Sequence, residues 1–295
     1  MYIRFALFLK YFDLKTTIKN DFLEIEILHR GAELCTIKSQ DKQYLWNGNP
    51  LFWGKHSPIL FPIVGTLKNN KYHIDAIEFE MSRHGFARDF DFVLIEHQDF
   101  KVVFELKSNV VTLKIYPFQF VLHVIYEIID SEIKVSFEVH NKNNFKMPFS
   151  IGGHPAFALT SYIENYELEF EIQETLTCFL LENDLLTANT YKIELQNKRL
   201  KLNYELFEND ALIFKDLRSK KVTVIEKNRK LLQISFSDFK NLGIWTKKKA
   251  PFICIEPWLG YADLTTSKGD FLKKEGIQTI NANTVYHCSY VISIF

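Results

Sequence analysis

The chain has 295 residues, of which 47% are hydrophobic and 24% are charged, a composition typical of a globular protein with a large core. Its 36 basic and 36 acidic residues give a formal net charge of +0, which argues against a nucleic-acid-binding protein with a broadly basic surface. Neither G-x-G-x-x-G nor G-x-x-x-x-G-K-[ST] occurs, so the common nucleotide-phosphate loops find no support.

The N-terminal residues 1–16 are predicted to be an extension, and residues 17–295 a single domain. The apolar run Phe5–Leu9 ends at Lys10 and is too short for a signal peptide or a membrane span. We therefore expect a soluble, cytoplasmic protein. The four cysteines lie far apart with no C-x-x-C pair, which predicts reduced, buried thiols and neither a disulfide framework nor a zinc site.

Alternation of apolar and polar residues predicts strands along most of the chain. The clearest run is Ile133–His140, which ends at the turn signal Asn141–Asn144. The predicted strands, in chain order, cover residues 23–27, 102–106, 120–128, 133–140, 168–172, 212–214, 222–225, 231–236, 253–255 and 285–294. Short helices fit only residues 161–166 and 269–274. Many strands without alternating helices predict an antiparallel all-β protein, packed as a large β-sandwich of two facing sheets.

Irregular stretches rich in polar and aromatic residues are the candidate binding loops. In one of them, His154 follows two glycines and precedes Pro155. Glycine allows unusual backbone conformations and proline fixes the turn, so the imidazole is expected on a stiff corner between apolar strands. A side chain that titrates near neutral pH suits acid–base chemistry from such a support. The alternative is a turn whose histidine only bonds nearby backbone.

Glu256 follows the apolar run Phe252–Ile255, so its strand is expected to leave the core just before the carboxylate. Pro257 is predicted to end that strand, and Trp258 offers a flat apolar face. A carboxylate beside aromatic rings is partly desolvated, which raises its pKa toward values useful to a general base. The alternative is a solvated glutamate at the rim.

His84 precedes Gly85 and is flanked by Arg83 and Arg88. The alternative for this segment is a surface loop whose arginines pair with Asp89 or Asp91. Other enzyme classes find little support, since neither a G-x-S-x-G nor an H-E-x-x-H motif occurs and no second carboxylate suggests a glycosidase. Histidine, glutamate and aromatic faces together suit a sugar ligand.

Three motifs, His84–Arg88, Gly153–Phe157 and Cys254–Trp258, resemble those of the aldose 1-epimerase (galactose mutarotase) superfamily, and most closely its LacX-like branch. The similarity runs from about Thr17 to Ile294. It implies a large β-sandwich of the galactose-mutarotase type, with a sugar in an open cleft across one sheet. The implied activity is interconversion of the α and β anomers of a hexose, without a metal or an organic cofactor.

The resemblance implies a role for each matching residue. Glu256 would be the general base that removes the proton of the anomeric hydroxyl, and His154 the general acid that protonates the ring oxygen. His84 would help to hold and polarise the ring-oxygen region. The ring would open to the aldehyde, rotate about the C1–C2 bond and close on the other face.

Four side chains are expected to contact the substrate, namely Lys55, Arg88, Trp258 and Asp263. Lys55 and Thr66 stand where many relatives carry arginine, and neither offers the planar guanidinium fork. A related branch acts on hexose 6-phosphates, and here Arg88 with Lys55 or His56 could supply an anion site. A second alternative is a non-catalytic carbohydrate-binding or sensing module on the same fold. The expected partner is a small-molecule sugar, with no nucleic acid and no membrane; the sequence leaves the oligomeric state open.

Overall fold

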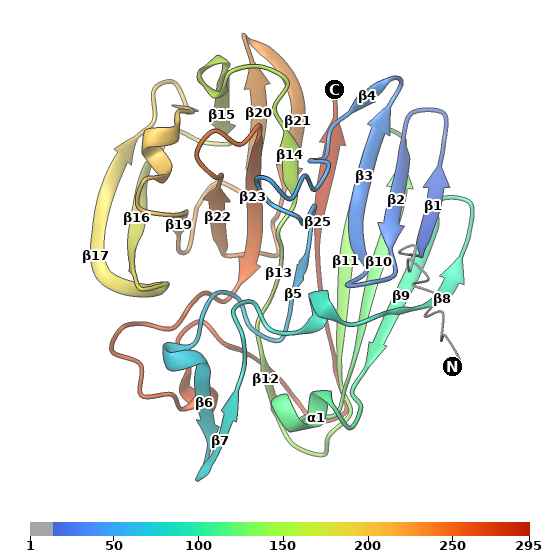
Figure 1. Ribbon diagram of the computed structural model, residues 1–295, viewed down its shortest axis with the longest axis vertical. Coiled ribbons are helices and arrows are strands. Elements are labelled where there is room, and N and C mark those ends of the chain that lie inside the picture. The colour runs from blue at the N-terminus through green and yellow to red at the C-terminus, as the bar shows by residue number, and fades with distance from the viewer. Residues whose placement is uncertain (1–13) are drawn as a thin grey trace, which may run out of the picture.

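The computed structural model describes residues 14–295 (Figure 1). The predicted N-terminal extension lies mostly outside the described residues. Its boundary needs correction, because strand β1 (Lys15–Lys19) already begins before residue 17. The named strands pair in antiparallel ladders, which confirms the predicted all-β class.

The largest sheet has nine strands and contains most of the strands that the sequence predicts. Their order across the sheet is β18 (Arg199–Lys201), β15 (Tyr166–Phe170), β20 (Lys221–Glu226), β21 (Arg229–Ser235), β25 (Val285–Ile294), β11 (Glu132–Asn141), β10 (Phe120–Ile129), β9 (Lys101–Lys107) and β8 (Val93–His97). In β11, Val135, Phe137 and Val139 are buried, whereas Glu138 and His140 between and beyond them are half-exposed. This sheet therefore has an apolar inner face and a polar outer face.

The second large sheet has seven strands in a row. Their order is β17 (Leu185–Glu194), β16 (Thr175–Glu182), β19 (Leu212–Phe214), β22 (Asn241–Trp245), β23 (Phe252–Leu259), β13 (Ile151–Gly153) and β5 (Ile59–Leu60), and β14 (Ala156–Ala158) pairs with β23 beside this row. All eight residues of β23 are buried. A strand buried on both faces lies in the interior of the molecule, and here it forms the floor of the candidate site.

Smaller elements complete the fold. The remaining strands are β2 (Glu24–Leu28), β3 (Glu33–Ser39) and β4 (Lys42–Gln43), which join β1 in a four-stranded sheet, and the pairs β6 (Lys71–Ile74) with β7 (Ile77–Glu80) and β12 (Met147–Phe149) with β24 (Gln278–Ile280). The helices are α1 (Thr112–Ile115) and the 3-10 turns η1 (Lys68–Asn70), η2 (Ala87–Asp89), η3 (Ile163–Asn165), η4 (Tyr204–Phe207) and η5 (Phe271–Lys273). Both predicted helices prove to be single 3-10 turns, η3 and η5. Among the described residues, no helix is long and apolar enough to span a membrane.

The two large sheets pack face to face over one apolar core, as predicted. Phe170 of the nine-stranded sheet meets Phe214 of the other sheet edge-on, with ring centroids 6.4 Å apart. Behind the candidate site, Tyr290 of β25 approaches Gly153 so closely that a Cβ there would lie 2.7 Å from its hydroxyl oxygen. The cysteines are buried and unpaired, as predicted; they are Cys35, Cys178, Cys254 and Cys288.

Candidate active site

Strand register brings His154 and Glu256 together. β23 pairs with β14 and β13 in a single register, in which Ala156 lies opposite Cys254. The pairing is interrupted around His154 and Pro155, and the same register places His154 opposite Glu256. Cross-strand neighbours share one face of a sheet. Their side chains accordingly meet, with His154 Nε2 3.2 Å from Glu256 Oε2.

Pro257 does not end the strand, contrary to the prediction, because β23 continues to Leu259. On the side of β14, the Ile255 N–H donates to the Pro155 carbonyl at 3.2 Å. Two residues further on, the proline nitrogen faces the same side, where the shared register places Gly153, the last residue of β13. The missing N–H therefore falls at the end of that ladder, beside the break between β13 and β14, and the strand tolerates the proline.

A loop after β7 presents His84 from the side. His84 has a left-handed backbone with φ of 68°, its N–H donates to the Gly65 carbonyl at 2.8 Å, and the Gly65 N–H donates to its Nδ1 at 3.1 Å. Arg83 Nε also lies 3.3 Å from Nε2, but a neutral imidazole accepts at one nitrogen only, and the fixed main-chain donor occupies Nδ1. The ring proton is therefore on Nε2. The ring stands edge-on to His154, with centroids 5.8 Å apart.

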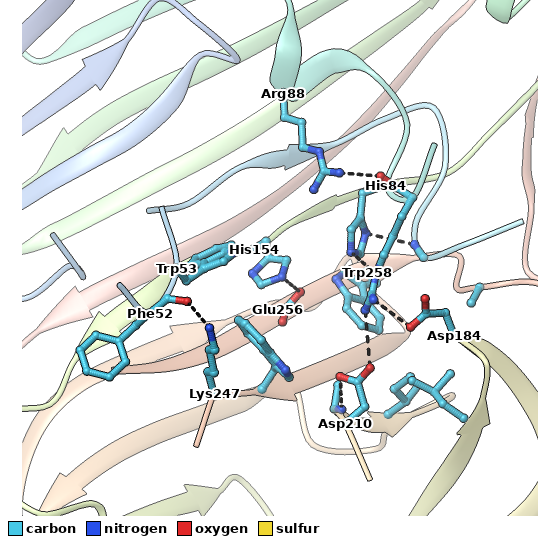
Figure 2. A pocket seen from close by; sticks show the side chains of 17 residues that line it. Phe52, Trp53, His84, Arg88, His154, Asp184, Asp210, Lys247, Glu256 and Trp258 are labelled. Atoms are coloured by element: carbon cyan, nitrogen blue, oxygen red, sulfur yellow. Dashed lines mark hydrogen bonds and ion pairs between the residues drawn. The ribbon is translucent and has the colours of Figure 1, made fainter. Parts of the chain in front are cut away.

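These three side chains line a cavity of about 500 Å³, drawn in Figure 2. Aromatic side chains form much of its wall, and Figure 2 shows Asp184 and Asp210 across the cavity from Lys247. Its further polar and aromatic lining consists of Phe52, Trp53, Arg83, Arg88, Asp184, Asp210, Trp245, Lys247 and Trp258. The cavity is therefore large enough for a small polar molecule with apolar faces.

Burial governs the protonation of the His154–Glu256 pair. Removal from water lowers the pKa of His154 to about 3 and raises the pKa of Glu256 well above its usual value. The positive charge of Arg83 acts against burial at Glu256, since it favours the carboxylate. Because a charge on either partner alone is costly, the favoured state of the pair holds one proton, on Glu256, beside a neutral His154.

Burial is also the main reason that the pKa of His84 lies well below its usual value, and the nearby His154, Arg83 and Arg88 lower it further. His84 is consequently a neutral imidazole that presents Nε2–H as a hydrogen-bond donor. A neutral donor beside a shared-proton pair can bind or polarise an oxygen atom without taking part in the proton exchange.

Aromatic rings fix the orientation of the site. Trp53 stacks on the His154 ring with centroids 4.8 Å apart and an interplanar angle of 28°. Trp258 packs where Gly152 and Gly243 leave room, since a Cβ at Gly152 would lie 2.7 Å from its Cδ1 and one at Gly243 would collide with the ring. Glu256 Oε2 and Trp258 Nε1 are buried and make no hydrogen bond within residues 14–295. They are free to bind a ligand.

An acidic pair that sequence reasoning missed also lines the cavity. Arg83 Nη1 lies 3.0 Å from Asp184 Oδ1, and Arg83 Nη2 lies 3.9 Å from Asp210 Oδ2. Arg83 is therefore not paired with Asp89 or Asp91, as the surface-loop alternative assumed. Asp184 sits in the turn between β16 and β17, about a hundred residues from Arg83 in sequence, and no local motif announces this contact.

Two of the four predicted substrate contacts line the cavity, and two do not. Arg88 and Trp258 are in its wall, and Arg88 donates to the Arg83 carbonyl at 2.7 Å. Lys55 lies outside it and pairs with Asp89 at 3.6 Å. Asp263 also lies outside and is buried, because Lys274 holds it at 2.9 Å and the Lys68 N–H donates to it at 3.0 Å.

Arg88 and Lys55, which were named for a possible anion site, both pair with Asp89, at 3.7 and 3.6 Å. His56 pairs with the buried Glu33 at 3.4 Å, so that its imidazole faces a carboxylate. Thr66, which stands in place of a frequent arginine, does not line this cavity. In the cavity itself, His154, Cys254 and Glu256 are close enough for a metal ion, but burial raises the pKa of the Cys254 thiol well above its usual value, which makes it a poor ligand.

Comparison with known proteins agrees with this architecture. The model of the aldose 1-epimerase family matches residues 15–278. Protein LacX of Lactococcus lactis subsp. lactis is 38% identical over 259 residues, which are 82% of this chain and 87% of that protein.

Solved structures with the same fold include a galactose mutarotase related enzyme from Lactobacillus acidophilus, which is 32% identical, has a TM-score of 0.92 and matches over 96% of this chain and 97% of that chain. A galactose mutarotase-like protein from Lactobacillus casei ATCC 334 is 31% identical, with a TM-score of 0.89 and coverage of 96% and 100%. The predicted resemblance is confirmed: the chain belongs to the aldose 1-epimerase family, in its LacX-like branch.

Proposed function

We propose that this protein is an aldose 1-epimerase that interconverts the α and β anomers of a hexose by acid–base-catalysed ring opening and closure. The observation that carries the proposal is the pairing of His154 with Glu256 at 3.2 Å in the floor of the cavity. Anomer exchange needs one proton removed and one delivered at neighbouring oxygen atoms. A buried pair that shares a single proton supplies both functions at once.

In the proposed reaction, the reactive form of the pair carries its proton on His154. The Glu256 carboxylate takes the proton of the anomeric hydroxyl while His154 gives its proton to the ring oxygen. The C1–O5 bond breaks as the C1=O1 bond forms, so the pair again holds one proton. After rotation about C1–C2, the reverse steps close the ring on the other face. Each positioned group is expected to contribute roughly 10²–10⁴-fold.

His84 fits the role of a donor to the ring-oxygen region. Its Nδ1 accepts from the Gly65 N–H, and its Nε2–H would reach a ligand once the Arg83 Nε–H, now 3.3 Å away, turns aside. As a neutral group it does not compete with His154 for the shared proton. The aromatic walls complete the proposal, because the C–H face of a sugar packs on flat rings while its hydroxyls bind the polar groups at the floor.

Most cations at or near the cavity already face an acidic side chain, which favours a neutral hexose over a hexose phosphate. Lys247, which also lines the cavity, donates to the Phe52 carbonyl at 3.0 Å. Lys55 and His56 each face a carboxylate outside the cavity. Arg83 is held between two acidic side chains, and Arg88 lies 3.7 Å from Asp89 and donates to a main-chain carbonyl. None of these last four cations is a free partner for a phosphate group among the described residues.

Exchange NMR between the anomers of glucose and of galactose tests the proposal. Wild-type protein should accelerate exchange, and His154→Gln and Glu256→Gln should each lower the catalysed rate by roughly 10²–10⁴-fold. Matched controls come from the outer face of the nine-stranded sheet, where His123 and Glu138 form a second cross-strand pair at 3.0 Å. His123→Gln and Glu138→Gln should keep activity within about twofold.

Two outcomes would overturn the proposal. One is wild-type protein that binds either sugar without accelerating exchange, which would favour the sensing module. The other is a Glu256→Gln variant that is folded and retains the wild-type rate. Acceleration confined to hexose 6-phosphates would instead replace the neutral hexose by a phosphorylated one.

A further inference from the structure

A second cluster of histidine and glutamate lies on the outer face of the nine-stranded sheet, away from the cavity. His123 stands directly opposite Glu105 of β9 on one side and Glu138 of β11 on the other. His287 of β25 lies opposite Glu138 on its far side. Figure 1 shows these four strands side by side, so one row of side chains crosses them all.

The row is closely packed around the Glu138 carboxylate. His123 Nδ1 lies 3.0 Å from Glu138 Oε2, and His123 Nε2 lies 3.1 Å from Glu105 Oε2. His140 is two residues beyond Glu138 on the same strand and face, with Nε2 3.4 Å from the same Oε2. His287 Nδ1 lies 3.6 Å from the other oxygen, Oε1.

One nitrogen in this cluster lacks a partner. His140 Nε2 is buried and makes no hydrogen bond to any residue that the structure describes. It points at the same oxygen atom that His123 approaches, and its ring centroid lies 4.8 Å from that of His123. Burial of an unbonded polar atom is costly unless a ligand satisfies it.

We propose that His123 Nδ1, His140 Nε2 and Glu138 form a binding site for a divalent transition-metal ion such as Zn²⁺, with His287 within reach as a fourth ligand. The three ligand atoms lie within 4.8 Å of one another. Ligands bonded at about 2.0–2.1 Å in a tetrahedral zinc site are about 3.3 Å apart, close to the 3.0 and 3.4 Å separations found here.

Glu105 supplies a further feature of such sites. A histidine that binds metal through one nitrogen usually donates its other N–H to a carboxylate, which fixes the ring and its tautomer. Glu105 Oε2 is placed to accept from His123 Nε2 in this way.

The test is zinc binding to the full chain after metal removal with a chelator, measured by competition with a chromophoric chelator. Wild type should bind one Zn²⁺ at this site with a Kd of about 1 μM or lower. Loss of a carboxylate that holds a metal-binding histidine lowers metal affinity about 10–100-fold, so Glu105→Gln should weaken zinc binding by this factor. His123→Gln and His140→Gln each remove a ligand and should weaken zinc binding by about 100-fold or more. Zn²⁺ should also raise the melting temperature of wild type but not of His140→Gln.

Two controls separate this site from others. His97→Gln removes an exposed histidine at the end of β8 and should not change zinc affinity. Cys254→Ser alters the possible metal cluster in the cavity and should also leave affinity unchanged. Three results would overturn the proposal: no binding by wild type at 100-fold the expected Kd, unchanged affinity in a folded His140→Gln variant, or loss of binding in Cys254→Ser.

Discussion

Two of the cross-strand pairs of histidine and glutamate among the described residues have opposite properties because their surroundings differ. His154 and Glu256 are 3.2 Å apart and lie in the cavity, only 8% and 1% exposed. His123 and Glu138 are 3.0 Å apart on the outer sheet face, where both are half-buried. Residue types, register and distance are nearly the same, so none of these alone defines an acid–base pair.

Solvent access makes the difference. At Glu256 burial dominates and raises the pKa well above its usual value. At Glu138 burial also raises the pKa, but the hydrogen bond from His123 and the neighbouring histidines outweigh it, and the pKa is lowered. A carboxylate kept ionised in this way suits a cation, whereas one that holds a proton suits proton exchange.

Substitution of the second cross-strand neighbour of each glutamate is expected to give the largest difference between the two pairs. Glu256 has Gly243 as its second cross-strand neighbour, whereas Glu138 has His287. Gly243→Ala would push a methyl group into the Trp258 ring. We expect a loss of about 1–3 kcal/mol in unfolding free energy, as for other overpacked cores, and about a 10²-fold loss of activity from the displaced indole.

His287→Ala, at the matching place beside Glu138, should change neither the anomer-exchange rate nor the stability by a measurable amount. Denaturant unfolding and exchange NMR on both variants measure the difference. Wild-type rates in a folded Gly243→Ala protein would show that the position of Trp258 is not important for the site.

The pH dependence of stability tests the effect of burial on Glu256. Its folded-state pKa is raised above the usual value of 4.5, so its protonated form stabilises the folded state fully below that pH. This contribution is lost as the pH rises toward the raised pKa, because the unfolded chain releases the proton at its ordinary pKa whereas the folded protein must keep it or hold a buried charge.

We therefore expect Glu256→Gln to gain stability relative to wild type between pH 5 and pH 8, as measured by denaturant unfolding at a series of pH values. A neutral amide avoids the cost of the buried charge. A stability difference that is independent of pH would show that Glu256 has an ordinary pKa and would remove the contrast with Glu138.

The stacked ring of Trp53 should give the smallest effect. An aromatic contact is worth about 0.5–1.5 kcal/mol beyond its buried area. If Trp53 orients His154, Trp53→Leu should lower kcat/KM by about 3–10-fold with little change in fold. A pure loss of affinity, seen as a higher KM at constant kcat, would instead assign Trp53 to sugar binding alone.

Strand patterns and local motifs in the sequence predicted much of this structure. The alternation in Ile133–His140 predicted β11 because one face of that strand is buried and the other is not. The sequence also indicated three candidate site residues, His84, His154 and Glu256, because glycine, proline or aromatic residues stand next to each of them. Their meeting in one cavity depends on strand register, which the sequence showed only through resemblance to a family.

The contacts that were missed depend on distant partners. No sequence motif near Asp184 indicates its contact with Arg83, because the turn between β16 and β17 reaches the loop that follows β7. Asp263 looked like a substrate contact because it follows Trp258 closely, yet Lys274 binds it in the interior. Pro257 was expected to end its strand because the gap in the neighbouring strand cannot be read from Pro257 itself.

That gap, between β13 and β14, makes the number of residues as important as their identity. Side chains of a strand alternate between its two faces, so one residue gained or lost between Gly153 and Ala156 would turn His154 toward the opposite face or force β14 out of register. Substitutions in the loops around the cavity can alter which sugar fits. Insertions and deletions at this point would abolish the pair outright, so divergence of this protein is expected to proceed by replacement here and by length change only elsewhere.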